Sequence, residues 1–346
     1  MLSKQRQSNA LHHSERSEES PMKCLVAIVG PTAVGKSELA LHLARDFPVE
    51  IVSADSRQVY RYMDIGTNKP TLAERASVPH HLIDVVNPDE DFNLAMYHQL
   101  ATEAIKAIQQ KGKLPLLVGG SGLYLWSILE GWKIPQVPPN PKLRCDLEAR
   151  AKREGSYMLY KELQQIDPLA ATKIHPGNIR RIIRALEIYH MTGQLPSQLW
   201  RKEAPGFPIR IIGLTVERSK LYNRIDQRVD KMIQKGLVAE VEELVKMGYS
   251  FSLPSMSGIG YKQVGQFLQG QLTLPAAIEQ IKYETHHFAR HQYAWFHLDD
   301  ERIHWFDVSP SSIILSPSLP VILSVVKNLI SLRVNSPKNL IRGFIA

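Results

Sequence analysis

The chain has 346 residues, 44% of them hydrophobic and 22% charged, and a formal net charge of +8. This length allows one large or two ordinary domains with a substantial core. Two cysteines, Cys24 and Cys145, exclude a disulfide framework and a four-ligand zinc site, and no window approaches the ~18 uninterrupted apolar residues of a membrane span. The positive charge permits a nucleic-acid partner without requiring one. We expect a reducing, cytoplasmic compartment.

Two terminal segments lack the patterning of the rest. Residues 1–21 are polar, without the apolar core of a signal peptide, and we expect a disordered leader. Residues 308–346 are rich in serine and proline, with no clear periodicity, and form a C-terminal extension of unknown role. We therefore expect residues 21–310 to fold and to be active without either segment.

The first patterned stretch is a strand, a glycine loop and a helix. Residues 25–29 are apolar and β-branched, which predicts a buried strand, and residues 38–47 carry a helical apolar face. Between them the loop matches the phosphate-binding pattern G-x-x-x-x-G-K-[ST], whose backbone N–H groups surround phosphate oxygens at a helix N-terminus. A chance match in a glycine turn is the alternative. We expect diphosphate or triphosphate to contact Gly30, Thr32, Ala33, Val34, Gly35, Lys36 and Ser37, with the Ser37 hydroxyl as a ligand of Mg²⁺.

Two further strands are predicted to end beside this loop. Residues 49–54 form the second strand and run into Asp55-Ser56-Arg57-Gln58, where ligands bind in open α/β sheets. Residues 114–118 form another strand and run into Gly119-Gly120-Ser121, which brings a hydroxyl to the same edge. Both Asp55 and Ser121 have a plain alternative, because either residue could simply cap the helix or turn that follows. His80 and His81 lack metal-site spacing, and we expect structural roles for them.

A helical block interrupts the α/β pattern. Four prolines between residues 135 and 141 mark a boundary, and the chain then reads as helical to about residue 197. On the helix after Asn178, the apolar stripe leaves Arg180, Arg181 and Arg184 on the other side, where they suit phosphate oxygens. The alternative is a solvated charged face. Residues 209–216 then return to a strand, so the block reads as an insertion in one α/β domain.

The predicted fold is therefore α/β, with a P-loop NTPase-like, mostly parallel sheet flanked by helices and an all-helical insertion domain. The core comprises residues 22–140 and 205–307, and the insertion comprises residues 141–204.

The later part of the core adds more cations. A helix is predicted from Lys220 to Met247, with Arg224 and Arg228 one turn apart. Surface ion pairs with nearby aspartates are the alternative for these arginines. The glycine-rich stretch from Ser257 to Lys262 could approach a nucleic-acid backbone and base. A last helix over residues 282–296 carries Arg290-His291-Gln292.

Taken together, these landmarks resemble the tRNA dimethylallyltransferase family, also called tRNA isopentenyltransferases, over about residues 25–307. Two positions depart from its pattern: Ser121 replaces a common threonine, and His291 stands in a usually more basic triplet. The zinc-finger cysteines of some eukaryotic members are absent, so a bacterial type is implied. The landmarks, in order, are the phosphate loop, Asp55-Ser56, Met63-Asp64-Ile65-Gly66-Thr67, Pro79-His80-His81-Leu82-Ile83-Asp84, Gly119-Gly120 with Leu123-Tyr124, Ile174-His175-Pro176, Arg184-Ala185-Leu186-Glu187 and Gly260-Tyr261.

The resemblance implies transfer of a dimethylallyl group from its diphosphate to N6 of the adenosine 3′ of the anticodon in tRNA, with Mg²⁺ and with diphosphate as product. Asp55 and Ser121 are the expected catalytic residues, and Arg224 and Arg228 the expected additional diphosphate ligands. We expect a monomer. The expected tRNA contacts are Asp55, Ser56, Arg57, Gln58, Ser121, Arg144, Arg180, Arg181, Arg184, Ser257, Gly258, Gly260, Tyr261 and Lys262.

Other classes of protein also use a phosphate loop. A kinase of a nucleoside or small metabolite fits the loop equally well, but leaves the basic insertion and the Gly119-Gly120-Ser121 turn without a role. A GTP-binding switch needs Asn-Lys-x-Asp, and the nearest match, Asn68-Lys69-Pro70-Thr71, lacks the aspartate. A non-enzymatic RNA-binding module leaves the intact phosphate loop unexplained.

Overall fold

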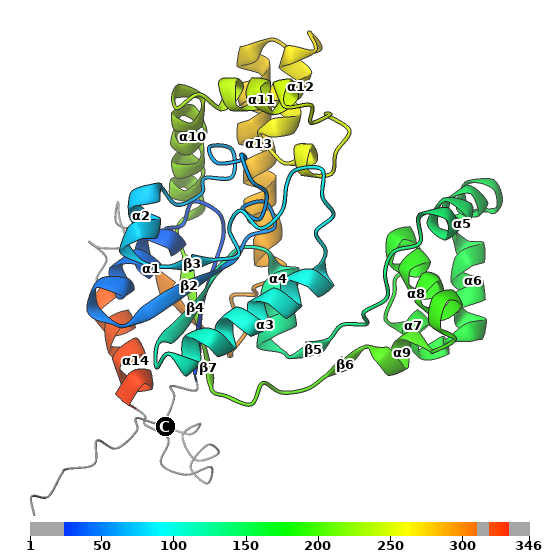
Figure 1. Ribbon diagram of the computed structural model, residues 1–346, viewed down its shortest axis with the longest axis horizontal. Coiled ribbons are helices and arrows are strands. Elements are labelled where there is room, and N and C mark those ends of the chain that lie inside the picture. Colours follow the sequence, from blue (N-terminus) through cyan, green and yellow to red (C-terminus); the bar gives the residue numbers. More distant parts are fainter. Residues whose placement is uncertain (1–23, 310–317, 332–346) are drawn as a thin grey trace, which may run out of the picture.

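A computed structural model describes residues 24–309 and 318–331. Its centre is a six-stranded parallel sheet in the order β3-β2-β4-β1-β7-β8 (Figure 1), which confirms the predicted fold class. Such parallel sheets are covered on both faces, so their central strands are apolar throughout. The strands are β1 (Leu25–Val29), β2 (Val49–Ala54), β3 (His80–His81), β4 (Leu114–Gly119), β7 (Ile209–Thr215) and β8 (Ile303–Asp307).

The strand register brings three carboxyl ends to one edge. Ile28 of β1 and Ser53 of β2 both pair with Val118 of β4, so the segments after these strands start side by side. The contact between β2 and β4 is close at their ends, because a Cβ on Gly119 would lie 2.1 Å from the carbonyl oxygen of Ala54. The predicted convergence of three strand ends is confirmed.

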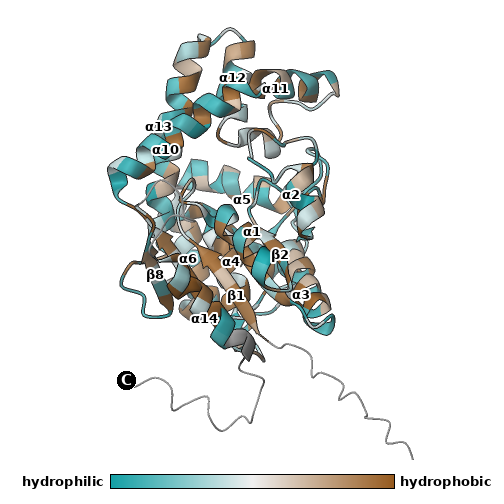
Figure 2. Cartoon of the chain, turned by 90° about the vertical axis from the view of Figure 1, so that its left-hand side faces the viewer, coloured by the Kyte–Doolittle hydropathy of each residue, from teal (hydrophilic) through white to brown (hydrophobic). Residues whose placement is uncertain are grey.

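Helices cover both faces of the sheet. β1 is hydrophobic along its length (Figure 2), and each of its five side chains is fully buried. Among the described residues, no helix is long and apolar enough to cross a membrane. The helices of this part are α1 (Lys36–Asp46), α2 (Leu72–Ser77), α3 (Leu94–Gln110), α4 (Gly122–Leu129), α10 (Arg218–Gln234), α11 (Leu237–Lys246), α12 (Tyr261–Leu268), α13 (Leu274–Tyr293) and α14 (Leu319–Ser331), with a 3₁₀ turn over Ser255–Ser257.

Two predicted helices have different bounds. The helix expected from Lys220 to Met247 is two helices, because Gly236 adopts a left-handed conformation (φ 97°) that ends α10 and starts α11. The last helix begins at Leu274 rather than Lys282. Thr273 caps it by accepting a hydrogen bond from the Ala276 N–H, and Pro275 fits its first turn.

The helical block has its own core. Leu147, Leu159, Leu163, Ile182 and Leu186 belong to one buried cluster that does not include residues of the sheet. A short antiparallel ribbon, β5 (Trp132–Lys133) with β6 (Arg201–Lys202), leads to the block and back, and the block stands apart from the sheet (Figure 1). Its helices are α5 (Pro141–Glu154), α6 (Ser156–Ile166), α7 (Pro168–Thr172), α8 (Ile179–Thr192) and α9 (Pro196–Leu199).

The C-terminal segment contains a helix that the sequence pattern did not predict. Leu319, Ile322 and Val326 of α14 are buried in the same core cluster as β1 and α1. Their spacing is helical, and Pro320 lies in the first turn, where proline is tolerated. The extension over residues 308–346, to which the sequence analysis assigned no role, therefore contributes to the core, and a chain of residues 21–310 would lack this contact. The expected leader lies outside the described residues.

Removing the α14 contact should lower stability. We expect Ile322→Ala, at a fully buried side chain, to reduce the free energy of unfolding by about 2–5 kcal/mol. The matched control is Val321→Ala on the same helix, which is 54% exposed and should change it by less than about 0.5 kcal/mol. Urea denaturation measures both, and equal values for the two variants would show that α14 is not docked in solution.

Candidate active site

The glycine loop encloses a lysine. Gly35 takes a left-handed conformation (φ 110°) at the N-terminus of α1, and Gly30 leaves no space for a Cβ, which would lie 2.4 Å from the carbonyl oxygen of Leu214. The Lys36 ammonium folds back and donates to the carbonyl oxygens of Gly30 (2.9 Å) and Pro31 (2.7 Å). The hydroxyl-bearing Ser37 is exposed in the first turn of α1.

Two arginines from α10 reach this loop. Arg228 Nη1 donates to the Thr32 hydroxyl (3.1 Å), and Arg224 Nη2 donates to the Val308 carbonyl oxygen (2.9 Å) beside the loop. Burial, and then the charge of Arg228, lower the pKa of Lys36 to about 7, while Asp55 opposes this shift. Burial likewise lowers the pKa of Arg228, again opposed by Asp55. The structure thus brings Lys36, Arg228 and Asp55 into one electrostatic cluster.

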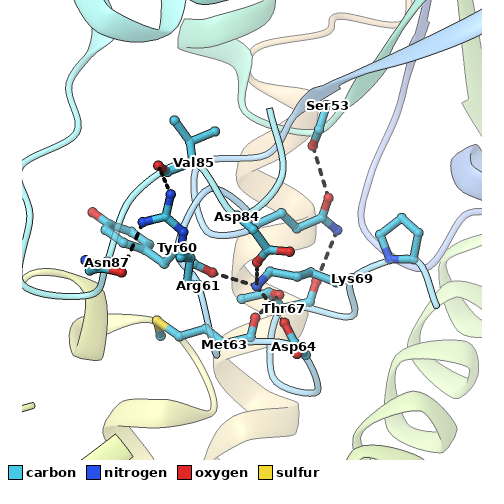
Figure 3. A network of polar contacts seen from close by, with 12 residues as sticks. Ser53, Tyr60, Arg61, Met63, Asp64, Thr67, Lys69, Asp84, Val85 and Asn87 are labelled. Carbon is cyan, nitrogen blue, oxygen red and sulfur yellow. Dashed lines mark hydrogen bonds and ion pairs between the residues drawn. The ribbon is translucent and has the colours of Figure 1, made fainter. Parts of the chain in front are cut away.

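A cavity of about 620 Å³ opens beside the loop. Ala33, Arg224 and Arg228 line one side, and residues from the loop before α2 line the other. There the Lys69 ammonium is buried between Asp64, Asp84 and the Tyr60 carbonyl oxygen, each 2.6 Å away (Figure 3). Because the Lys69 ammonium is bound by two carboxylates and a carbonyl oxygen, its charge stabilises this side of the cavity. The positive charge that faces the cavity comes from Arg224 and Arg228.

The two predicted catalytic residues, Asp55 and Ser121, follow the ends of the adjacent strands β2 and β4. The Asp55 carboxylate is half-buried and accepts a hydrogen bond from the Arg57 N–H (2.8 Å), closing a turn. Ser121 stands at the first position before α4, but its hydroxyl makes no capping bond there and accepts instead from the Ser56 N–H (3.1 Å). The capping alternative for the Ser121 side chain is therefore wrong, and Asp55 keeps a local structural role in its turn.

Gln292 joins these segments, and it was not among the predicted site residues. Its side chain is 3% exposed and accepts from the Thr32 N–H of the glycine loop (2.7 Å). It also donates to the Gly120 carbonyl oxygen (3.0 Å), and a Cβ on Gly120 would lie 2.0 Å from its Nε2. The sequence signal for this residue is the Arg290-His291-Gln292 triplet, in which the amide of Gln292 rather than the charge of its neighbours makes the contact.

The side chains of Arg57 and Gln58, which follow Asp55, make hydrogen bonds within the protein. Arg57 donates to the Pro254 carbonyl oxygen (2.8 Å) and to the Ser257 hydroxyl (3.3 Å), which ties the end of β2 to the turn before α12. Gln58 accepts from the Ser53 hydroxyl (3.0 Å) and donates to the Thr67 carbonyl oxygen (3.3 Å) (Figure 3). Both side chains position the loop that carries Asp55.

Tyr261 is not available to stack on a base. It is 1% exposed, and its hydroxyl donates to Glu240 (2.6 Å), whose carboxylate also accepts from the N–H groups of residues 64–66. Gly258 and Gly260 are buried as well, which leaves Ser257 and Lys262 exposed in this stretch. Contact of Tyr261 with tRNA is a wrong expectation, because Glu240 requires the hydroxyl in the interior.

The arginines of the insertion divide into two kinds. Arg180 and Arg181 are exposed. Arg184 and Arg144 both bind Glu187, which is fully buried; Arg144 does so with two hydrogen bonds of 2.8 Å. A buried carboxylate needs such partners. The Arg184 guanidinium also donates to the Val137 carbonyl oxygen (2.8 Å). These two residues therefore have a structural role whatever else they contact.

Both of the paired histidines contact protein groups, and Nδ1 of His80 lies 2.8 Å from the Val78 carbonyl oxygen. His81 lies 2.7 Å from the Glu50 carboxylate, which is 1% exposed. Burial alone would raise the pKa of Glu50, but hydrogen bonds from His81, Lys113 and Lys111 lower it to about 2. Within residues 24–309 and 318–331, no three His, Cys, Asp or Glu side chains group as a metal site, and Cys24 and Cys145 are both free.

A phosphate loop at the edge of a parallel sheet, two arginines directed at it, and a carboxylate and a hydroxyl at adjacent strand ends define a P-loop-type group-transfer enzyme. The chain belongs to the IPP transferase family, whose model matches residues 58–299.

Similar proteins are found among sequences and solved structures. The chain is 57% identical over 272 residues to a tRNA dimethylallyltransferase of Roseiflexus castenholzii, covering 79% of this chain and 89% of the relative. It is 51% identical over 287 residues to one of Thermomicrobium roseum, covering 83% and 87%. A tRNA isopentenylpyrophosphate transferase from Bacillus halodurans matches with TM-score 0.66 and 39% identity, covering 90% of this chain and 98% of that one. A eukaryotic dimethylallyltransferase described as acting on tRNA matches with TM-score 0.77 and 29% identity, covering 89% and 80%.

Proposed function

We propose that this enzyme transfers a dimethylallyl group from dimethylallyl diphosphate to N6 of the adenosine 3′ of the anticodon in tRNA. The observation that carries the proposal is the cluster of Lys36, Arg228 and Asp55, in which an anion site and a proton acceptor lie together. We further propose that it acts as a cytoplasmic monomer, and that the unit formed by α5–α9 is a tRNA-binding insertion.

The diphosphate would lie against the glycine loop. As the allylic C–O bond breaks, negative charge grows on the leaving diphosphate, and fixed donors at that point lower the barrier. Lys36 and Arg228 supply two such donors, and Arg224 lies one turn earlier on α10. Their present partners are carbonyl and hydroxyl oxygens, which phosphate oxygens can replace with stronger, charge-assisted bonds.

Mg²⁺ fits this site in a limited way. The Ser37 hydroxyl is exposed at the N-terminus of α1, and Mg²⁺ commonly keeps several waters while binding one or two protein oxygens and substrate phosphates. When bound, the ion would neutralise part of the diphosphate charge. Lys36, Arg224 and Arg228 supply the remaining positive charge from the protein itself.

The nucleophile is the exocyclic amine of adenosine. A base inside a stack cannot present N6 to the allylic carbon, so the base must leave the stack to enter the site. The new N6–C bond forms as the C–O bond breaks, and the amine then releases a proton, for which the Asp55 carboxylate is the acceptor at the strand edge. The Ser121 hydroxyl, which already accepts from the Ser56 N–H, retains a proton to donate and would orient the amine or the diphosphate.

One assay tests the proposal against the P-loop kinase alternative. The enzyme is incubated with radiolabelled dimethylallyl diphosphate and bulk tRNA, and separately with ATP and small acceptors. We expect label in tRNA and no ATP-dependent phosphorylation of the acceptors. ATP turnover without labelled tRNA would overturn the proposal.

The lowered pKa of Lys36 predicts proton uptake on diphosphate binding. With a pKa of about 7, Lys36 is largely neutral at pH 8 and largely charged at pH 6. A bound anion raises this pKa, so binding should take up about one proton at pH 8 and almost none at pH 6. Calorimetry of dimethylallyl diphosphate in buffers of different ionisation enthalpy measures the uptake, and Lys36→Met should abolish the difference. Equal uptake at both pH values in the unmodified enzyme would contradict the assignment.

A further inference from the structure

One side of α13 exposes a row of rings at four-residue intervals. Tyr283, His287, His291 and Trp295 follow one another along the helix and just past its end. Tyr283 is 63% and Trp295 43% exposed, and His291 is exposed as well. The first three rings lie close to one another, with centroids 4.9 Å apart for Tyr283 and His287 and 6.2 Å apart for His287 and His291. We call these four residues the ring row.

The row ends at the active site. A Cβ on Gly122 would lie 2.2 Å from Cγ of Trp295, so this ring packs on the start of α4, one residue after Ser121. The Trp126 indole N–H donates to the Trp295 carbonyl oxygen (2.8 Å), which fixes the end of the row. Figure 1 shows α13 extending from the neighbourhood of α4 towards α11 and α12. The row therefore continues outward from the site where a base would enter.

Packing of α13 does not require the rings of Tyr283, His287 and His291. The helix is held through its buried side, which carries Ala277, Ile281, Ala289 and Gln292. The face towards α10 is occupied by other contacts, in which His286 stacks on Tyr222 (4.1 Å) and Lys282 binds Asp230 (2.9 Å). Exposed aromatic groups that gather on one face are a mark of a binding surface.

The chemistry of the row suits unpaired bases. Aromatic and imidazole rings stack on any base, and such stacking dominates recognition of single-stranded RNA. One carboxylate beside the row, that of Glu284, lies 3.8 Å from the Lys262 ammonium, which offsets its charge. A protein partner would not account for a row whose last ring packs on Gly122, next to Ser121.

We propose that the ring row is a stacking surface for unpaired anticodon-loop nucleotides next to the adenosine that enters the site. This inference rests on the proposed function. It assigns positioning of the RNA to α13, in addition to the basic residues of the insertion, and it predicts that recognition there depends on rings rather than on charge.

Substitution of the two histidines tests ring against charge. We expect His287→Ala with His291→Ala to weaken binding of an anticodon stem-loop RNA by about fivefold or more, as for loss of base stacking. His287→Phe with His291→Phe should retain near-normal affinity, whereas His287→Lys with His291→Lys should not. The KM for dimethylallyl diphosphate should stay unchanged in every variant, because the row lies outside the anion site. Affinity restored by lysine but not by phenylalanine would overturn the proposal in favour of phosphate contacts.

A second measurement uses the RNA as the variable. The unmodified enzyme should bind a stem-loop with an abasic nucleotide next to the target adenosine more weakly than it binds the intact stem-loop. The double-alanine variant should bind these two RNAs equally well. Independent, additive losses would show that the row does not touch these bases. Fluorescence anisotropy measures affinity here without turnover. Failure of the proposed function would appear separately, as absence of label transfer to tRNA by the unmodified enzyme.

Discussion

Asp55→Ala should lower the turnover number by about 10²–10⁴ while tRNA affinity stays within a few-fold, because loss of a general base typically costs that much in rate. The carboxylate lies at the end of β2, in electrostatic contact with Lys36 and Arg228. Single-turnover labelling of tRNA with saturating dimethylallyl diphosphate measures the chemical step, and filter binding measures the affinity.

The control for this prediction is Asp55→Asn. An amide oxygen can still accept the hydrogen bond from the Arg57 N–H, so the turn after β2 is kept while the charge is removed. We expect Asp55→Asn to lose nearly as much rate as Asp55→Ala. If the asparagine variant kept near-normal activity, the carboxylate would serve only as a hydrogen-bond acceptor in its turn.

Removing the α10 arginines should separate the two substrates. We expect Arg228→Ala to reduce kcat by about 10²–10³, as for loss of one fixed donor to a developing anion, and Arg224→Ala to act in the same direction. Neither should change the salt dependence of tRNA binding. Arg180→Ala with Arg181→Ala should do the opposite: diphosphate kinetics unchanged, tRNA binding weaker, and the salt slope flatter by roughly one unit per lost phosphate contact at most.

Arg184→Ala provides the matched control within the insertion. Because Arg184 binds the buried Glu187, its removal should lower the stability of the α5–α9 unit as well as any tRNA affinity. Thermal unfolding distinguishes this variant from the exposed pair. The α10 variants and the insertion variants could instead affect tRNA affinity and diphosphate kinetics alike. In that case the insertion would reach the anion site, and the assignment of the two groups of arginines to different substrates would be wrong.

Local sequence patterns predicted much of this site. The glycine loop, Asp55 and Ser121 each follow an apolar strand, and parallel strands place their carboxyl ends at one edge. Arg224 and Arg228 were recognisable because their helical spacing puts both on one face. These predictions needed only the position of each residue within its own element.

The misinterpreted residues depend on contacts between elements distant in sequence. Tyr261 carries the residue type of a base-stacking group, but Glu240 and residues 64–66 draw it inside. Gln292 bridges two loops that lie more than 170 residues before it, and no local pattern encodes such a contact. The helix at Leu319–Ser331 was not predicted, because serine and proline are frequent in residues 308–346 and mask the helical spacing of its buried residues.

The most direct test of the account is to locate the product. tRNA treated with the enzyme and dimethylallyl diphosphate is digested with a nuclease, and mass spectrometry identifies the modified fragment and nucleoside. We predict an N6-dimethylallyl adenosine in the fragment that contains the anticodon, on its 3′ side, and none with Asp55→Ala. A dimethylallyl group on another nucleoside or atom, or unmodified tRNA with a folded enzyme, would contradict the account.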